Sequence, residues 1–120
     1  MSETTTTVQR YLELIGKGSA DNIVALFADD ATVEDPVGSE PRVGRQAIHA
    51  FFATLESLER ETELISLRVC GYEAAFQFAI TFSAGDGQMR LEPIDTVVFD
   101  SDGRITSLRS YFSPSDVTQL

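Results

Sequence analysis

The sequence has little of several residue types that would support metal or disulfide chemistry. Among 120 residues there is no tryptophan, one cysteine, Cys70, and one histidine, His49. A single cysteine cannot form a disulfide within the chain, and this pair alone offers too few ligands for a zinc site and a poor basis for a Cys-His nucleophile. We therefore expect no metal. We interpret His49 as part of a solvated helix flank and Cys70 as a small buried apolar residue.

Long apolar runs and positive charge are also scarce. No apolar run approaches the roughly 18 to 20 residues needed to cross a bilayer, and the chain does not begin with a signal-peptide pattern. Nine Lys and Arg stand against nineteen Asp and Glu, which gives a formal charge of −10. This balance repels phosphate backbones and anionic headgroups. We therefore expect no nucleic-acid partner, no membrane partner, a cytoplasmic location and a neutral ligand.

The chain length predicts one domain over residues 1–120, with a loose threonine-rich start at residues 1–7. Apolar residues at helical spacing predict three helices: residues 8–15, a segment from the N-cap Ser19 to about residue 28, and about residues 44–58. Their apolar stripes are Val8, Tyr11, Leu12 and Ile15; then Ile23, Val24, Phe27 and Ala28; then Ile48, Phe51, Phe52 and Leu55.

Elsewhere the apolar residues alternate, which is typical of strands. The expected strands are residues 31–36, 61–70, 73–82, 88–99 and 104–112, with turn signals at 84–87 and 100–103. In the third of these strands one face is an apolar wall of Phe76, Phe78, Ile80 and Phe82. This order of elements predicts an α+β fold, in which the helices gather on one face of a curved, mainly antiparallel sheet.

Asp35 is unusual because its strand places it toward the interior. At a period of two it shares a face with Ala31 and Val33, whereas Glu34 points to the other side. An unpaired buried carboxylate costs several kcal/mol or takes up a proton, so such a residue often serves chemistry. A structural alternative is that Asp35 hydrogen-bonds the loop over residues 36–41.

Asp95 repeats this pattern in a later strand. Counting by two, the residues that share its face are all apolar: Leu91, Pro93, Val97 and Phe99. The proline indicates a sheet edge or a bulge, which would change the face of Asp95. The structural alternative is an ion pair across the sheet with Arg68 or Arg109.

Tyr11 adds an inward phenol from the first helix, although a tyrosine on an apolar stripe can equally be a core residue. Two inward carboxyl groups and a phenol suit proton transfer better than hydrolysis or redox chemistry. A base must be ionised near neutral pH, whereas a carboxylic acid that donates to an oxyanion must keep its proton. Asp35, beside a polar loop, suits the base, and Asp95 suits the protonated donor alongside Tyr11.

A long sequence run, IVALFADDATVEDPVGSEP at residues 23–41, closely resembles bacterial Δ5-3-ketosteroid isomerases. The similarity continues in Val8-Gln9-Arg10-Tyr11 and in Pro93-Ile94-Asp95, and it extends from about Val8 to Phe112. That family is itself a known example of one ionised and one neutral aspartate in the same site. Its site residues map onto Tyr11, Asp35 and Asp95.

The resemblance implies a cone-shaped α+β fold like that of nuclear transport factor 2, with a mixed, mainly antiparallel sheet and three helices on its concave side. It also implies a homodimer and no cofactor. Asp35 would carry a proton from C4 to C6 of a 3-oxo-Δ5-steroid, giving the 3-oxo-Δ4-steroid, while Tyr11 and Asp95 donate to the C3 oxygen of the dienolate. The steroid-binding residues would be Phe27, Phe51, Phe52, Phe78, Ile80, Phe82, Val97, Leu108 and Phe112.

The chain departs from some family members at Phe27 and Phe52, where they carry tyrosines. Tyr11 would then lack that hydrogen-bond support, and a modest loss of rate would follow. Other functions stay open because a fold does not fix a function. A polyketide cyclase or epoxide hydrolase would use an interior acid differently. A non-catalytic binder of steroids or other hydrophobic ligands would keep the cavity without turnover, and a dimerising scaffold would need neither carboxylate.

Overall fold

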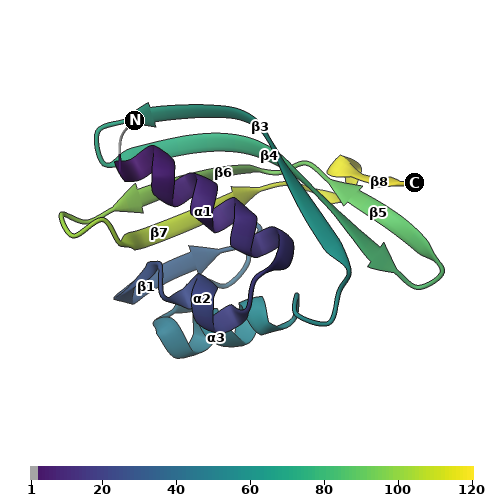
Figure 1. The fold of residues 1–120 in the computed structure, drawn as a ribbon, viewed down its shortest axis with the longest axis horizontal. Helices are drawn as coiled ribbons and strands as arrows, with labels where there is room; N and C mark the ends of the chain where they lie inside the picture. Colours follow the sequence, from purple (N-terminus) through teal and green to yellow (C-terminus); the bar gives the residue numbers. More distant parts are fainter. Residues whose placement is uncertain (1–2) are drawn as a thin grey trace.

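Three helices pack against the concave side of one curved sheet in the computed structural model, which describes residues 3–120 (Figure 1). The helices are α1 (Glu3–Lys17), α2 (Ala20–Val24) and α3 (Arg45–Ala53), with a short 3-10 helix η1 (Pro114–Asp116) near the C-terminus. The strands are β1 (Phe27–Glu34), β2 (Arg42–Val43), β3 (Arg60–Cys70), β4 (Glu73–Ala84), β5 (Gly87–Leu91), β6 (Ile94–Phe99), β7 (Ile105–Tyr111) and β8 (Val117–Gln119).

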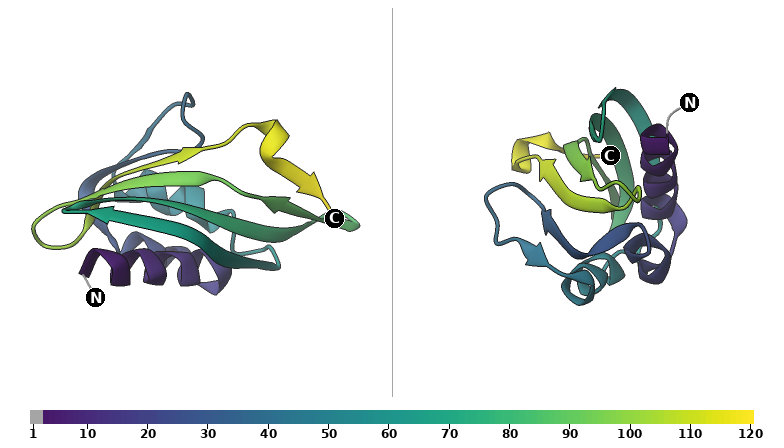
Figure 2. Two further views of the ribbon diagram at one scale, coloured as in Figure 1. Left: turned by 90° about the horizontal axis from the view of Figure 1, so that it is seen from above. Right: turned by 90° about the vertical axis from the view of Figure 1, so that its left-hand side faces the viewer.

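The sheet is mixed and mainly antiparallel, as predicted. Its order is β2-β1-β7-β6-β4-β5-β8, with β3 paired to β4 off this path. The β1–β7 pair is parallel, and the other pairs are antiparallel. The two views of Figure 2 show how strongly the sheet curves around the helices. The fold class predicted from the sequence is therefore confirmed.

The core forms where the helices meet the concave side of the sheet. The predicted stripe of α1 is buried, with each of its four residues at most 5% exposed. Phe76, Phe78 and Ile80 of β4 are buried in the same core, and Phe82 is partly buried against it. The strand alternation and the helix periodicity therefore identified the correct inner faces, because burial on one side fixes the register of both kinds of element.

The helix bounds differ from the prediction at three places. Helix α1 begins at Glu3, so the expectation of a loose start is wrong for residues 3–7, while Met1 and Ser2 lie outside the described residues. An acidic residue in the first turn favours that helix start. Helix α3 ends at Ala53, and residues 54–57 continue as turns rather than as helix.

Helix α2 begins after Ser19, whose side chain accepts a hydrogen bond from the Asn22 amide at 3.2 Å, as predicted. It ends at Val24, and the prediction that Phe27 and Ala28 belong to this helix is wrong, since both lie in β1. Phe27 pairs with Ile105 of β7. Long-range pairing therefore overrides a local pattern that fits a helix.

The strand predictions need smaller corrections. The segment expected as one strand over residues 88–99 splits into β5 and β6 at Pro93, which has no amide hydrogen to give to a sheet ladder. Cys70 was expected to be buried and is exposed, because it ends β3 at the edge of the sheet. The short strands β2 and β8 carry no pattern that predicted them.

No helix within residues 3–120 is long and apolar enough to cross a membrane. The cytoplasmic location and the absence of nucleic-acid and membrane partners stay predictions from the sequence.

Ile94 and Tyr111, neighbours in register on β6 and β7, are 48% and 41% exposed. Neighbouring Asp95 and Ser110 are buried, so the sheet has a core-facing side and a side that exposes large apolar groups.

Candidate active site

A cavity of about 240 Å³ lies between helices α1 and α3 and the concave side of the sheet. Its volume is near the lower end of the roughly 300 to 1,000 Å³ typical of small-molecule sites. The lining is apolar apart from four residues that could exchange hydrogen bonds or protons with a ligand: Tyr11, Asp35, Asp95 and Ser110. The three residues predicted to carry the chemistry therefore meet in one cavity.

Six of the nine predicted steroid-binding residues line this cavity: Phe51, Phe52, Phe78, Ile80, Phe82 and Phe112. Phe27, Val97 and Leu108 are buried but do not line it, so their contact with a steroid stays a prediction. Val97 and Leu108 pair across β6 and β7 and lie in the core near Val8 and Tyr11 of α1. Counting strand faces placed Val97 on the inner side, and the resemblance added Leu108, but neither could show how far the cavity extends along the sheet.

The prediction missed six lining residues: Ile15, Leu55, Leu58, Leu91, Pro93 and Ser110. Ile15 and Leu55 lie on helix stripes that the sequence already showed, and Leu91 and Pro93 share the predicted face of Asp95. Ser110 could have been found from its alternation with Leu108 and Phe112 in the last long strand.

Asp35 directly follows β1, next to the loop that leads to β2. Burial raises the pKa of the Asp35 carboxyl to about 6, and the positive charge of Arg42 partly opposes this shift. Nη1 of Arg42 also donates to the backbone carbonyl of Asp35 at 3.4 Å. A carboxyl group with this pKa is mostly ionised at pH 7 yet still binds a proton readily, as a general base requires.

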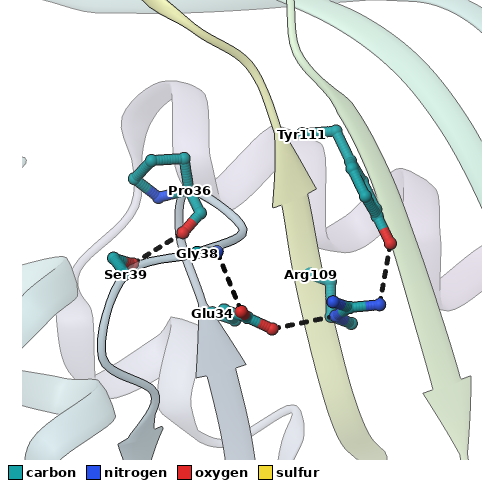
Figure 3. Close-up of polar contacts among 6 residues, drawn as sticks. All are labelled: Glu34, Pro36, Gly38, Ser39, Arg109 and Tyr111. Atoms are coloured by element: carbon teal, nitrogen blue, oxygen red, sulfur yellow. Dashed lines mark hydrogen bonds and ion pairs between the residues drawn. The ribbon is translucent and has the colours of Figure 1, made fainter.

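The hydrogen bond to the following loop that was considered for Asp35 is made by its neighbour Glu34 (Figure 3). The Glu34 carboxylate accepts from the Gly38 amide and from Nε of Arg109, each at 2.9 Å. Nη1 of Arg109 donates in turn to the Tyr111 hydroxyl at 2.8 Å, and the Ser39 hydroxyl donates to the Pro36 carbonyl at 2.6 Å. These contacts tie the loop after Asp35 to β7, so Glu34 holds the loop while Asp35 faces the cavity.

Asp95 is buried in β6, with only 1% of the residue exposed. The ion pairs considered for it do not form: Arg109 bonds to Glu34, and Arg68 donates to the Leu67 carbonyl at 2.9 Å. Burial raises the pKa of Asp95 to about 8; a hydrogen bond with Ser110 opposes this rise, and the negative charge of Asp35 adds to it. Within residues 3–120, Oδ1 of Asp95 has no hydrogen-bond partner.

Tyr11 of α1 is 3% exposed and sits among aromatic rings. The rings of Phe27, Phe52 and Phe76 pack edge-on against it, with centroids 6.5, 6.2 and 6.2 Å away. Burial raises the pKa of the Tyr11 phenol well above its usual value, and the charges of Asp95 and Asp35 raise it further. Tyr11 therefore keeps its proton and can donate it in a hydrogen bond. Phe27 and Phe52 supply packing but no hydroxyl.

The cavity thus combines one ionised carboxylate, one protonated carboxylic acid and one phenol. This arrangement can take a proton from an apolar ligand and donate hydrogen bonds to an oxygen on which negative charge develops. His49 takes no part in it, since its Nε2 lies 2.7 Å from Oδ1 of Asp21 at the surface. Cys70 lies at the exposed end of β3.

Comparisons with known proteins point in the same direction. Residues 8–108 match the family model of SnoaL-like domains. The chain is 45% identical over 116 residues to a steroid Delta-isomerase of Nocardioides simplex, covering 97% of this chain and 94% of that protein. The match therefore covers nearly the whole of this chain.

Two solved structures share the fold. One is SalBIII, an epoxide hydrolase/cyclase-like enzyme in pyran ring formation in the polyether salinomycin. It matches with a TM-score of 0.91 and 25% identity, and the match covers 98% of this chain and 95% of that one. The other is RV0760c from Mycobacterium tuberculosis, with a TM-score of 0.91, 21% identity and coverage of 100% and 98%. The second likeness concerns the fold alone.

Proposed function

The chain belongs to the SnoaL-like family, and we propose that it is a steroid delta-isomerase that works without a cofactor. It would convert 3-oxo-Δ5-steroids to 3-oxo-Δ4-steroids by proton transfer through a dienolate. The observation that carries this proposal is a pair of carboxyl groups in one apolar cavity whose pKa values, about 6 and about 8, lie on either side of neutral. The identity to the Nocardioides simplex enzyme supports the same reaction.

Asp35 is the proposed base. Its ionised carboxylate would remove a proton from C4 of the steroid, and the electrons of that C–H bond would shift toward the C3 oxygen. The protonated Asp35 would then return the proton at C6, so that the double bond moves into conjugation and no atom is gained or lost. A positioned base of matched pKa contributes about 10² to 10⁴ in rate.

Tyr11 and Asp95 are the proposed donors to the C3 oxygen. The oxygen becomes an oxyanion in the dienolate. Tyr11 holds its proton at neutral pH as phenols do, and Asp95 holds one because burial raises its pKa to about 8. Donors that are in place before the charge develops stabilise it strongly in an apolar site, by roughly 3 to 4 kcal/mol each. The pair would therefore act as an oxyanion hole.

We further propose that two chains associate through the side of the sheet that faces away from the helices. Ile94 of β6 and Tyr111 of β7 stand directly opposite each other on that side and are 48% and 41% exposed. Large exposed apolar groups that gather on one surface mark interaction sites. Sedimentation equilibrium should then give the mass of two chains, and Ile94→Glu should reduce it to one. A wild-type mass of one chain would contradict the dimer.

The test of the reaction follows the ultraviolet absorbance of the conjugated enone after the protein is mixed with a 3-oxo-Δ5-steroid. The wild-type protein should form the product, and Asp35→Asn should lower turnover by about 10² or more while a phenolic steroid still binds. Asp30→Asn is a matched control, because Asp30 is an exposed aspartate of β1.

The outcomes separate the alternatives. Steroid binding without conversion by the wild-type protein would favour a non-catalytic binder. Conversion by Asp35→Asn at the wild-type rate would remove Asp35 from the mechanism, and loss of phenolic-steroid binding would assign it a structural role. The likeness to SalBIII makes an epoxide substrate the second candidate, and consumption of a hydroxy-epoxide in place of the steroid would support cyclase-like chemistry.

A further inference from the structure

Arg42 contacts two residues of the cavity at once. Its Nη1 donates to the backbone carbonyl of Asp35, and its guanidinium carbon lies 4.0 Å from the centroid of the Phe51 ring. Phe51 belongs to α3 and lines the cavity, as Asp35 does. Arg42 therefore connects the proposed base to an aromatic wall of the substrate site.

The sheet register explains why Arg42 reaches this position. Strand β2 has two residues and pairs antiparallel with β1, so that Arg42 stands opposite Val33. Val33 is fully buried on the inner face, and Asp35, two residues further along the chain, lines the cavity. Directly opposed residues in an antiparallel pair share a face. The pairing thus directs Arg42 toward the cavity side rather than toward the outer side of the sheet.

We propose that Arg42 is a positioning residue for the proposed reaction: it keeps Asp35 ionised near neutral pH and holds the Phe51 ring against the substrate. This inference rests on the function proposed above. The positive charge of an arginine guanidinium favours the ionised form of a nearby carboxyl group. Its planar guanidinium also stacks on an aromatic face, which a lysine does less well.

The other charged groups around Asp35 do not replace Arg42. Asp95 faces the same cavity from β6 and Tyr11 from α1, but both keep their protons at neutral pH. Glu34, the preceding residue, points to the opposite side of the sheet and is bonded to Arg109 there. Arg42 is the positive charge that lowers the pKa of Asp35 against the effect of burial.

Three variants separate the two effects of Arg42. Arg42→Gln removes the charge but keeps a polar side chain. Arg42→Lys keeps the charge but weakens the stack on Phe51. Arg68→Ala, which removes an exposed positive charge of β3, is the control. The pKa of Asp35 is measured by ¹³C NMR of labelled aspartate carboxyl groups, with Asp35→Asn assigning the signal. The kinetics are measured as kcat and KM over pH.

In Arg42→Gln we expect the Asp35 titration and the acid limb of kcat/KM to move together to higher pH. A rise of one in this pKa would lower the ionised fraction at pH 6 by about fivefold, with much less effect at pH 7.5. In Arg42→Lys the acid limb should stay in place while KM rises about two- to fivefold through the loosened Phe51 wall. Arg68→Ala should behave as the wild type.

The NMR titration needs no turnover, so the two proposals can fail separately. If the wild-type protein makes no product but Arg42→Gln still raises the pKa of Asp35, the isomerase proposal fails and the effect of Arg42 on Asp35 stands. If the protein makes product and neither the Asp35 titration nor the acid limb moves in Arg42→Gln, the inference about Arg42 is overturned. If Arg42→Gln does not fold, an unchanged KM in Arg42→Lys, together with an Asp35 titration unchanged in folded Arg42→Ala, would overturn it as well.

Discussion

Asp35 and Asp95 line the same cavity, and burial raises the pKa values of both carboxyl groups, but to different levels of about 6 and about 8. The negative charge of Asp35 also raises the pKa of Asp95, so ionisation of the first makes the second keep its proton. Between these two values the cavity contains one carboxylate and one carboxylic acid. Two residues of the same type can thus serve as a base and as a donor because their surroundings differ.

The first prediction is a bell-shaped dependence of kcat/KM on pH. Activity should rise as the pH passes about 6, because Asp35 loses its proton, and fall above about 8, because Asp95 loses the proton that it donates. Asp95→Asn cannot ionise and should remove the alkaline limb while keeping the acid limb. The enone assay over about pH 4.5 to 9.5 measures both, and an alkaline limb that persists in Asp95→Asn would assign that limb to another group.

The second prediction concerns stability, since a buried aspartic acid weakens the fold as pH rises. The unfolded chain loses the Asp95 proton near the ordinary value of 3.8, whereas the folded chain keeps it until about 8. Between these values the unfolded state binds fewer protons, so the free energy of unfolding falls with increasing pH. The accumulated cost at pH 7 is on the order of 4 kcal/mol as an upper bound.

Asp95→Asn should remove this share of the pH dependence. Denaturant unfolding at about pH 4.5 and pH 7.5 should therefore give a smaller loss of stability for the variant than for the wild type. At pH 7.5 the variant should be at least as stable. A melting temperature that drops sharply at pH 7.5 would mean that ionised Asp95 is held by a favourable partner in the folded state.

Much of the site could be predicted because one-sided burial fixes side-chain direction. Asp35 and Asp95 were assigned to the inner face by counting strand residues in twos, and Tyr11 by helical spacing, and the structure places all three on the cavity. Such counting gives the face of a residue but not its depth. Val97, on the counted face of Asp95, therefore seemed a lining residue although it lies in the packed core.

Other features depend on contacts between distant segments. Phe27 fits a helix stripe locally, but its pairing with Ile105 makes it part of β1. The exposure of Cys70 follows from the edge position of β3, which no local pattern shows. Arg42 carries no motif in the sequence, and its contact with Asp35 arises only when a two-residue strand pairs with β1. These parts of the site needed the sheet topology.

The third prediction is that Ser110 adjusts the acidity of Asp95. The two residues stand directly opposite each other on β7 and β6, both are buried, and their hydrogen bond opposes the effect of burial on the pKa of Asp95. In Ser110→Ala the alkaline limb of the pH profile should therefore move upward. The maximal kcat should fall about three- to tenfold, because the carboxyl group loses the hydroxyl that orients it.

Ser107→Ala provides the control for Ser110, since Ser107 belongs to the same strand and, like Arg109 and Tyr111, alternates to the other side of the sheet. Ser110→Thr retains the hydroxyl and should keep the alkaline limb near its wild-type position. If Ser110→Ala shows an unchanged alkaline limb, the hydrogen bond does not influence Asp95 in solution.

The fourth prediction tests how the loop after Asp35 is held. Glu34 accepts from the Gly38 amide and from Arg109, and these two bonds, in that order, lower the pKa of the Glu34 carboxyl. Glu34→Gln keeps an acceptor oxygen but removes the charge that strengthens both bonds. The loop should then hold Asp35 less firmly, and kcat should fall roughly tenfold with little change in KM, since misplacing a base affects the chemical step most.

The pH dependence distinguishes this effect from that of Arg42. Glu34 is ionised throughout the range in which the protein should be active, so Glu34→Gln should lower kcat by a similar factor at about pH 6.5 and pH 7.5. Glu63→Gln is the matched control, because Glu63 is an exposed glutamate of β3 that pairs with Arg90. A fall in kcat confined to low pH would mean that Glu34 acts on the charge of Asp35 instead of on its position, and an unchanged kcat would mean that the loop is held without the Glu34 carboxylate.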